Sequence, residues 1–109
     1  MKLLFTLTVA CGLMTASIAN AAVDADAAQA LLKKSDCFKC HAVDKKKDGP
    51  AFKETAKKYK GKADAEDKLV KHVTTKPMIE IDGKKEEHKA LKSTDAAEVK
   101  NVVQWILAQ

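Results

Sequence analysis

Apolar residues recur at helical spacing in several separate stretches of the chain. The stretch nearest the C-terminus is the clearest, with apolar residues at the i, i+3, i+4 and i+7 positions of one helix face: Val99, Val102, Val103 and Ile106. Ser93 or Thr94 is expected to cap this helix, because its hydroxyl oxygen can accept a hydrogen bond from an N–H of the first turn. The pattern predicts a C-terminal helix with one buried face.

Three shorter helices are predicted upstream. The Ala-rich segment 24–36 has acidic residues at its start and lysines near its end, which complements the helix dipole. Segment 51–60 has apolar and aromatic residues on one face and ends at Gly61, a residue common just after helices. Segment 65–74 follows Asp64, a residue type that often caps helices. The predicted elements indicate an all-α domain.

The segment from Met78 to Leu91 has no helical pattern. Apolar and polar residues alternate only around Ile79 and Ile81, and charged residues fill most of the remainder. The alternation favours at most a brief strand at these two isoleucines. We therefore expect an irregular loop between the third and the last helix.

The first 21 residues have the features of an export signal. Lys2 gives a positive start, residues 3–18 form an apolar run, and Ala19-Asn20-Ala21 fits the cleavage rule of small residues. A retained membrane anchor is the alternative, but the run is short for a membrane span and no stop-transfer flank follows it. We expect a cleaved signal peptide (1–21), one mature domain (22–109) and a periplasmic location.

Lysine dominates the charge of the chain. The formal net charge is +5, and all 20 basic residues are Lys. Nucleic-acid binders usually combine Arg with aromatic side chains that read bases, so this composition argues against nucleic acid as a partner. A solvated surface is one interpretation. The other is a face that docks acidic partner proteins, since complementary charge raises encounter rates.

The chemistry of the chain is concentrated in the five residues Cys37-Phe38-Lys39-Cys40-His41, a C-x-x-C-H motif. This spacing is the signature of covalent c-type haem attachment, in which both thiols form thioethers with one porphyrin. His41 would then ligate the iron as its proximal ligand. A thioredoxin-like pair would need a βαβ context, and a zinc site would need further ligands. Neither is found, so the cofactor we predict is a single covalent haem c.

With these residues placed, the chain resembles class I c-type cytochromes, closest to the small bacterial c-551/c-552 type. The resemblance covers nearly all of residues 22–109 and is carried by six segments: Ala30-Leu31-Leu32, Cys37 to Ala42, Gly49-Pro50-Ala51-Phe52, Tyr59-Lys60-Gly61-Lys62, Ala65 to Val73 and Val103 to Leu107. It implies a cytochrome c fold, with four or so short helices wrapped around one haem c.

The resemblance also implies roles for individual residues. The first and last helices of this family cross beside the haem, which would pack Leu31 or Leu32 near Val102 and Trp105. Pro50 matches the proline whose backbone carbonyl accepts the ring N–H of the proximal histidine.

The distal iron ligand is where the chain departs from the family, which normally supplies a Met. Met78 has the usual identity, but His88 has the usual distance from Trp105 in the last helix. Met78 lies ten positions further upstream, so Met ligation would require an insertion after the ligand. We favour His88 as the distal ligand and keep Met78 as the alternative. A second imidazole would give a lower reduction potential than a thioether.

These observations predict a periplasmic monohaem cytochrome that carries single electrons between redox partners. We expect no enzymatic activity of its own, because no residues are arranged for acid–base or nucleophilic chemistry. The partners would be acidic-surfaced redox proteins that dock transiently, and no membrane contact is expected once the signal is cleaved. A monomer is expected, since little apolar surface is left over. The alternative is a haem-based binder or sensor of diatomic gases with a labile distal ligand.

Overall fold

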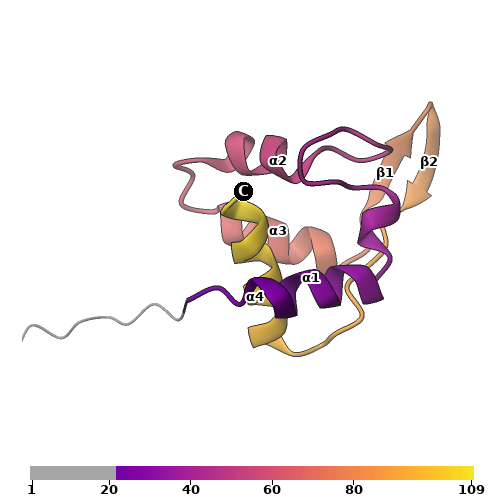
Figure 1. The fold of residues 1–109 in the computed structure, drawn as a ribbon. Helices are drawn as coiled ribbons and strands as arrows, with labels where there is room; N and C mark the ends of the chain where they lie inside the picture. Colours follow the sequence, from indigo (N-terminus) through magenta and orange to yellow (C-terminus); the bar gives the residue numbers. More distant parts are fainter. Residues whose placement is uncertain (1–21) are drawn as a thin grey trace, which may run out of the picture.

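The computed structural model describes residues 22–109, and the predicted export signal lies outside the described residues. In chain order the elements are α1 (Ala25–Lys34), the 3-10 turn η1 (Cys37–Lys39), α2 (Phe52–Tyr59), α3 (Ala65–Thr74), β1 (Met78–Ile81), β2 (Lys84–Glu87) and α4 (Ala96–Leu107) (Figure 1). The predicted class of four short helices is confirmed, with one small hairpin added to it.

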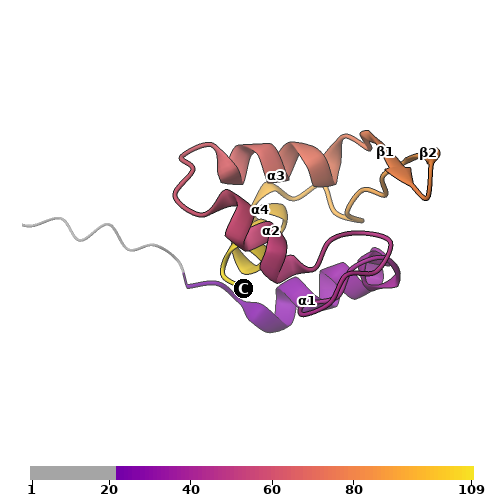
Figure 2. The ribbon, with the colours of Figure 1, turned by 90° about the horizontal axis from the view of Figure 1, so that it is seen from above.

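Helix α4 is the central element, because it packs against each of the other three α-helices. Figure 2 shows it between α1 and α3. Asp24 caps α1 by accepting a hydrogen bond from the N–H of Ala27 at 3.0 Å. The backbone of Asp24 also exchanges two 2.9 Å hydrogen bonds with the amide side chain of Asn101. The start of α1 is therefore fixed to the middle of α4.

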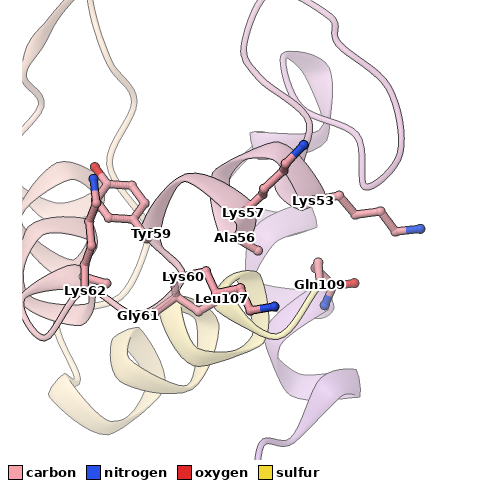
Figure 3. A pocket seen from close by; sticks show the side chains of 10 residues that line it. Lys53, Ala56, Lys57, Tyr59, Lys60, Gly61, Lys62, Leu107 and Gln109 are labelled. Atoms are coloured by element: carbon pink, nitrogen blue, oxygen red, sulfur yellow. The ribbon is translucent and has the colours of Figure 1, made fainter.

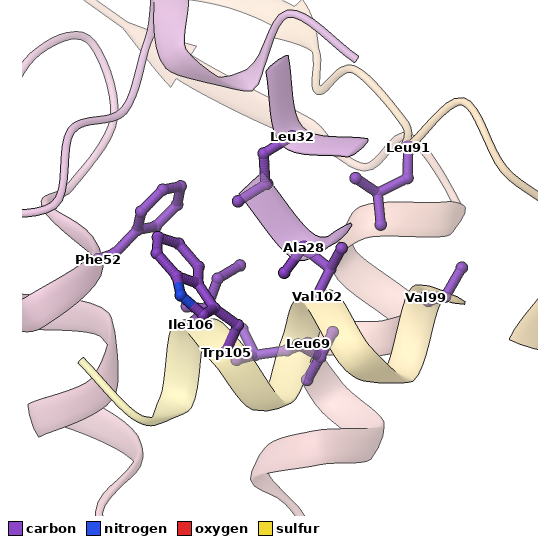
Figure 4. Close-up of a cluster of buried hydrophobic side chains, with 10 residues drawn as sticks. Ala28, Leu32, Phe52, Leu69, Leu91, Val99, Val102, Trp105 and Ile106 are labelled. Atoms are coloured by element: carbon purple, nitrogen blue, oxygen red, sulfur yellow. The ribbon is translucent and has the colours of Figure 1, made fainter. Parts of the chain in front are cut away.

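The core lies where α1, α2 and α3 meet α4 (Figure 4). Val102 and Val103 are completely buried, and Leu32 is 2% exposed within the same cluster. Trp105 joins this cluster, while Leu31 packs against it and is only half-buried. The expected contact between the first and last helices is therefore present, with Leu32 as the residue at its centre.

The cap of α4 differs from the prediction. Asp95 is the capping residue, and its carboxylate accepts a hydrogen bond from the N–H of Glu98 at 3.0 Å. Ser93 supports this cap from outside the helix: its hydroxyl donates to the Glu98 carboxylate and accepts from the N–H of Asp95 at 3.1 Å. The predicted caps were wrong by one or two residues, because Asp95 is also a strong capping residue and lies three before Glu98.

Helices α2 and α3 have the predicted bounds to within a residue. Gly61 follows α2 with φ +76°, a left-handed conformation that glycine adopts without steric cost. Asp64 precedes α3 as expected, but its side chain makes no capping hydrogen bond. It instead forms an ion pair with Lys68 at 3.0 Å, one turn into the helix.

The expected irregular loop before α4 is wrong for residues 78–87, which form an antiparallel hairpin. Met78 pairs with Glu87, and Ile81 pairs with Lys84. Asp82 and Gly83 at the turn have φ of +49° and +78°. Two successive left-handed residues match the right-handed twist of paired strands, which explains why an Asp-Gly turn closes a hairpin here.

None of the helices within residues 22–109 combines the length and the apolar character needed to cross a membrane.

Candidate haem-binding site

The two cysteines of the C-x-x-C-H motif lie on the turn η1, directly after α1. The N–H groups of Cys40 and His41 both donate to the carbonyl of Cys37, at 3.2 and 3.0 Å. In a 3-10 turn, residues three apart lie on the same side, so the two thiols project to one side of the chain. Both cysteines are free and half-buried, which leaves each thiol available for a covalent bond.

The environment of Cys37 differs from that of a catalytic thiol. Burial raises the pKa of the Cys37 thiol, and the negative charge of Asp36 raises it further. Reactive redox cysteines usually have a lowered pKa, because the thiolate is the nucleophile. Cys37 therefore lacks the lowered thiol pKa that a thioredoxin-like couple uses.

His41 is oriented by three neighbours. Its Nδ1 lies 2.8 Å from the carbonyl oxygen of Pro50. A carbonyl can only accept, so Nδ1 carries the proton and Nε2 keeps its lone pair. The ring stacks on Phe52 with centroids 5.2 Å apart and a 17° angle between the planes. A Cβ on Gly49 would lie 2.8 Å from Nδ1 and 2.9 Å from Nε2, so only glycine leaves room for this ring.

The loop between His41 and α2 is closed by backbone hydrogen bonds. The N–H of Gly49 donates to the carbonyl of Cys40 at 2.8 Å, and the N–H of Phe52 donates to the carbonyl of Ala42 at 2.9 Å. These bonds bring Gly49 and Pro50 back to His41. The same loop therefore supplies both the carbonyl that fixes the imidazole and the space beside it.

His88 lies directly after β2 and close to His41. The two ring centroids are 6.1 Å apart, with an angle of 58° between the planes. The N–H of His88 donates to the carbonyl of Pro77 at 2.8 Å, which places His88 at the open end of the hairpin. Its Nδ1 is buried and has no hydrogen-bond partner within the described residues. Met78 lies on β1 with 62% of its surface exposed.

His72 is a third histidine at this site, and the sequence analysis did not select it. Its ring centroid lies 4.3 Å from that of His88. Burial lowers the pKa of His72, and the charges of His41 and Lys58 lower it further. Burial also lowers the pKa of His88, as do His72 and His41, while the backbone of Lys89 partly opposes this. The signal that was missed is the position of His72 three residues after the buried Leu69, on the inward face of α3.

The donor atoms of this site fit a haem iron. A metal–nitrogen bond is about 2 Å long, so two imidazoles on opposite sides of one ion have ring centres about 6 Å apart. The separation of His41 and His88 is 6.1 Å. An unpartnered, buried imidazole nitrogen is costly unless something binds it, and His88 has such an atom.

Residues 25–109 match the family model described as Cytochrome c. The chain belongs to the cytochrome c family. Because c-type cytochromes carry covalently attached haem, its cofactor is one covalently bound haem c, for which Cys37 and Cys40 have the required spacing. The predicted resemblance to small class I c-type cytochromes is confirmed.

Solved structures give the same result. The class 1 cytochrome MtoD from Sideroxydans lithotrophicus ES-1 is 52% identical, with a TM-score of 0.77, over 80% of this chain and 97% of MtoD. Cytochrome c552 from Nitrosomonas europaea is 30% identical, with a TM-score of 0.57, over 72% of this chain and 95% of its own. The fold therefore agrees with almost the whole of MtoD and of cytochrome c552, over 80% and 72% of this chain.

Curated relatives match over a shorter region. Cytochrome c-551 from Pseudomonas aeruginosa is 42% identical over 45 residues, which are 41% of this chain and 43% of that protein. Cytochrome c-551 from Allochromatium vinosum is 49% identical over 43 residues, 39% of this chain and 46% of that protein. The matches span less than half the length of these relatives. None of these relatives supports the alternative of a gas sensor.

Proposed function

We propose that this chain is a monohaem electron carrier, which holds its haem between His41 and His88 and acts in the periplasm. The observation that carries the proposal is the pairing of these two imidazoles. One belongs to the C-x-x-C-H motif, and the other, 6.1 Å away, has a buried nitrogen without a partner. A single haem would account for both the C-x-x-C-H motif and the unpartnered nitrogen of His88.

Each residue has a separate role in this proposal. Cys37 and Cys40 form the two thioether bonds, and His41 is the proximal ligand through Nε2. Pro50 keeps the proton on Nδ1 of His41, with which its carbonyl oxygen makes a 2.8 Å hydrogen bond. His88 is the distal ligand. Met78, the alternative, is largely exposed on the hairpin.

A bound haem supplies an iron ion that gains and loses one electron. The protein contributes by restraining the side chains of the two iron ligands, His41 and His88, while the iron changes its charge. The ring of His41 is confined by Phe52 on one face and Gly49 close by. The segment around His88 is held through the carbonyl of Pro77. Little rearrangement of these side chains is then needed when the iron changes its charge.

The partners and the location that we propose are supported by the charge and the N-terminal pattern of the sequence. The formal net charge of +5, which becomes +4 when Lys2 is removed with the signal, suits brief docking to acidic-surfaced redox proteins, which would give and take the electron. The signal expected at residues 1–21 would export the chain, with no membrane contact after cleavage. We propose a monomer with no catalytic activity of its own.

The absorption spectrum of the purified ferric protein tests the ligand pair. Met–iron ligation gives a weak band at long wavelength, and we expect this band to be absent. His88→Ala should shift the iron to high spin, whereas Met78→Ala should leave the spectrum unchanged. A long-wavelength band that disappears only in Met78→Ala would contradict the proposal. Rapid binding of carbon monoxide to the reduced wild-type protein would instead favour the gas binder.

A further inference from the structure

Positive charge is concentrated in one short segment of the chain. Residues 53–62 contain five Lys and one Glu, which gives this segment a charge of +4, against +5 for the whole chain. The segment covers most of α2 and its connection to α3. The lysines are therefore not spread evenly over the surface.

Four of these lysines line a cavity of about 570 Å³ between the end of α2 and the C-terminal end of α4. Figure 3 shows Lys53, Lys57, Lys60 and Lys62 around it, together with Leu107 from the end of α4. Among residues 22–109, no acidic side chain lines this cavity. This volume lies in the range of ligand-binding pockets, which are about 300–1,000 Å³.

The protein itself neutralises little of this charge. Lys53 forms an ion pair with Asp44. Within residues 22–109, none of Lys57, Lys60 and Lys62 forms an ion pair. Lys57 lies in the last turn of α2, where it complements the helix dipole. Lys60 and Lys62 lie beyond that helix, so the dipole does not account for them.

Most of the cavity lies away from the haem-binding site; among its lining residues Lys53 comes nearest to that site in sequence, directly after Phe52, on which the ring of His41 stacks. Figures 1 and 2 show η1 and the hairpin at one end of the molecule and the α2–α3 connection at the other. A partner bound at the lysine cavity would leave the end with Cys37, Cys40 and His88 uncovered. The cavity could therefore hold a partner without blocking the site of electron exchange.

We propose that this cavity binds a carboxylate-rich peptide segment of a partner protein. Lysine ammonium groups act as flexible point charges, which suits carboxylates distributed along a chain, whereas compact phosphate recognition often uses the planar fork of Arg. The apolar lining at Ala56 and Leu107 accommodates the aliphatic part of such side chains. The identity of the partner as a redox protein rests on the proposed function, but peptide binding does not.

An NMR titration of the 15N-labelled, haem-loaded protein with a hexaglutamate peptide tests the proposal. Amide shifts should be largest at residues 57–62, should saturate, and should weaken as salt is added. Hexaglutamine should cause no shifts. Lys57→Gln/Lys60→Gln/Lys62→Gln should weaken binding by about tenfold, since each exposed charge pair contributes little alone.

The matched control removes the same charge elsewhere. Lys33→Gln/Lys34→Gln/Lys85→Gln changes three exposed lysines on α1 and the hairpin and should weaken binding less than the cavity variant does. Equal weakening by both variants, or shifts spread evenly over all lysines, would overturn the proposed site. If inorganic phosphate shifts the same amides at equal concentration, the assignment to a peptide is wrong.

A redox titration of the same sample checks electron transfer independently of peptide binding. Normal one-electron cycling without peptide binding would overturn only the cavity proposal.

Discussion

The buried hydroxyl of Ser35 accepts a hydrogen bond from the backbone N–H of Lys92 at 2.9 Å. Ser35 lies between α1 and Cys37 and is 1% exposed, whereas Lys92 lies shortly after His88. The next residue back, Leu91, donates its N–H to the carbonyl of Val73 in α3 at 2.9 Å. The segment that follows His88 is thus fixed both to the cysteine motif and to α3.

Ser35→Ala should therefore destabilise the protein and loosen the distal side of the site. The N–H of Lys92 would lose its partner in a partly buried place, and loss of a typical hydrogen bond costs about 0.5–1.5 kcal/mol. Urea denaturation measures this loss, and carbon monoxide binding to the reduced protein should become faster. Thr74→Ala is the control, because that hydroxyl is exposed and bonds only to Val70 in its own helix. Its effect should stay within about 0.5 kcal/mol.

Gly49→Ala should disturb the proximal histidine. The added methyl group would lie 2.8 Å from Nδ1 of His41, closer than real contacts allow, and the ring must move. We expect a lower yield of haem-loaded protein and a ferric spectrum with more high-spin iron.

Gly83→Ala is the matched control for this substitution. Gly83 has φ +78° and nothing within 4 Å of the new Cβ, so the change costs only backbone strain of about 1–2 kcal/mol. Its haem spectrum should equal that of the wild type. If Gly83→Ala changed the spectrum as much as Gly49→Ala, the close approach to His41 would not be the cause.

His88→Met should raise the reduction potential, because a thioether favours reduced iron more than an imidazole does. Spectroelectrochemistry measures the midpoint of both proteins, and the long-wavelength band of Met ligation should appear in the variant. Met78→Ala should leave the midpoint unchanged, since its side chain is mostly exposed. A midpoint that moves in Met78→Ala but not in His88→Met would contradict the assignment of His88.

Asp36 offers a test of strain next to the cysteine motif. The φ of Asp36, +61°, lies in the left-handed region, which residues other than glycine adopt at an energetic cost. Its carboxylate makes three long ion pairs, of 3.6 Å with Lys39 and 3.9 Å with Lys89 and Lys92. Asp36→Ala and Asp36→Gly both remove these weak pairs, but only Gly relieves the strain. We expect the Gly variant to be more stable than the Ala variant by about 1–2 kcal/mol in urea denaturation.

Much of the helical structure could be predicted from short-range patterns. The buried stripe of α4 was visible because Val99 to Ile106 repeat at helical spacing, and a repeat of this kind is a local property. The hairpin was harder to predict. Its second strand, Lys84–Glu87, is fully exposed and has no alternation, and the Asp-Gly pair at residues 82 and 83, a local hairpin signal, was not used in the prediction. The cap at Asp95 was missed because several capping residues stand side by side there.

The histidines differ in the same way: His41 could be recognised from neighbouring residues, whereas the proximity of His72 and His88 depends on the fold. The motif made His41 recognisable, because attachment chemistry requires fixed spacing between the cysteines and the ligand. His72 could not be connected with His88 from the sequence, since the hairpin separates them and only folding brings their rings to 4.3 Å.

The helices, the cysteine motif and the charge could be recognised in the sequence, because each depends on neighbouring residues or on composition. The tertiary fold sets which side chains meet. It brought His88 to His41, placed Lys92 on Ser35, and joined the ends of α2 and α4 into one lysine-lined cavity. The physical reason is that these contacts arise from the packing of the helices onto α4, which no short stretch of sequence encodes.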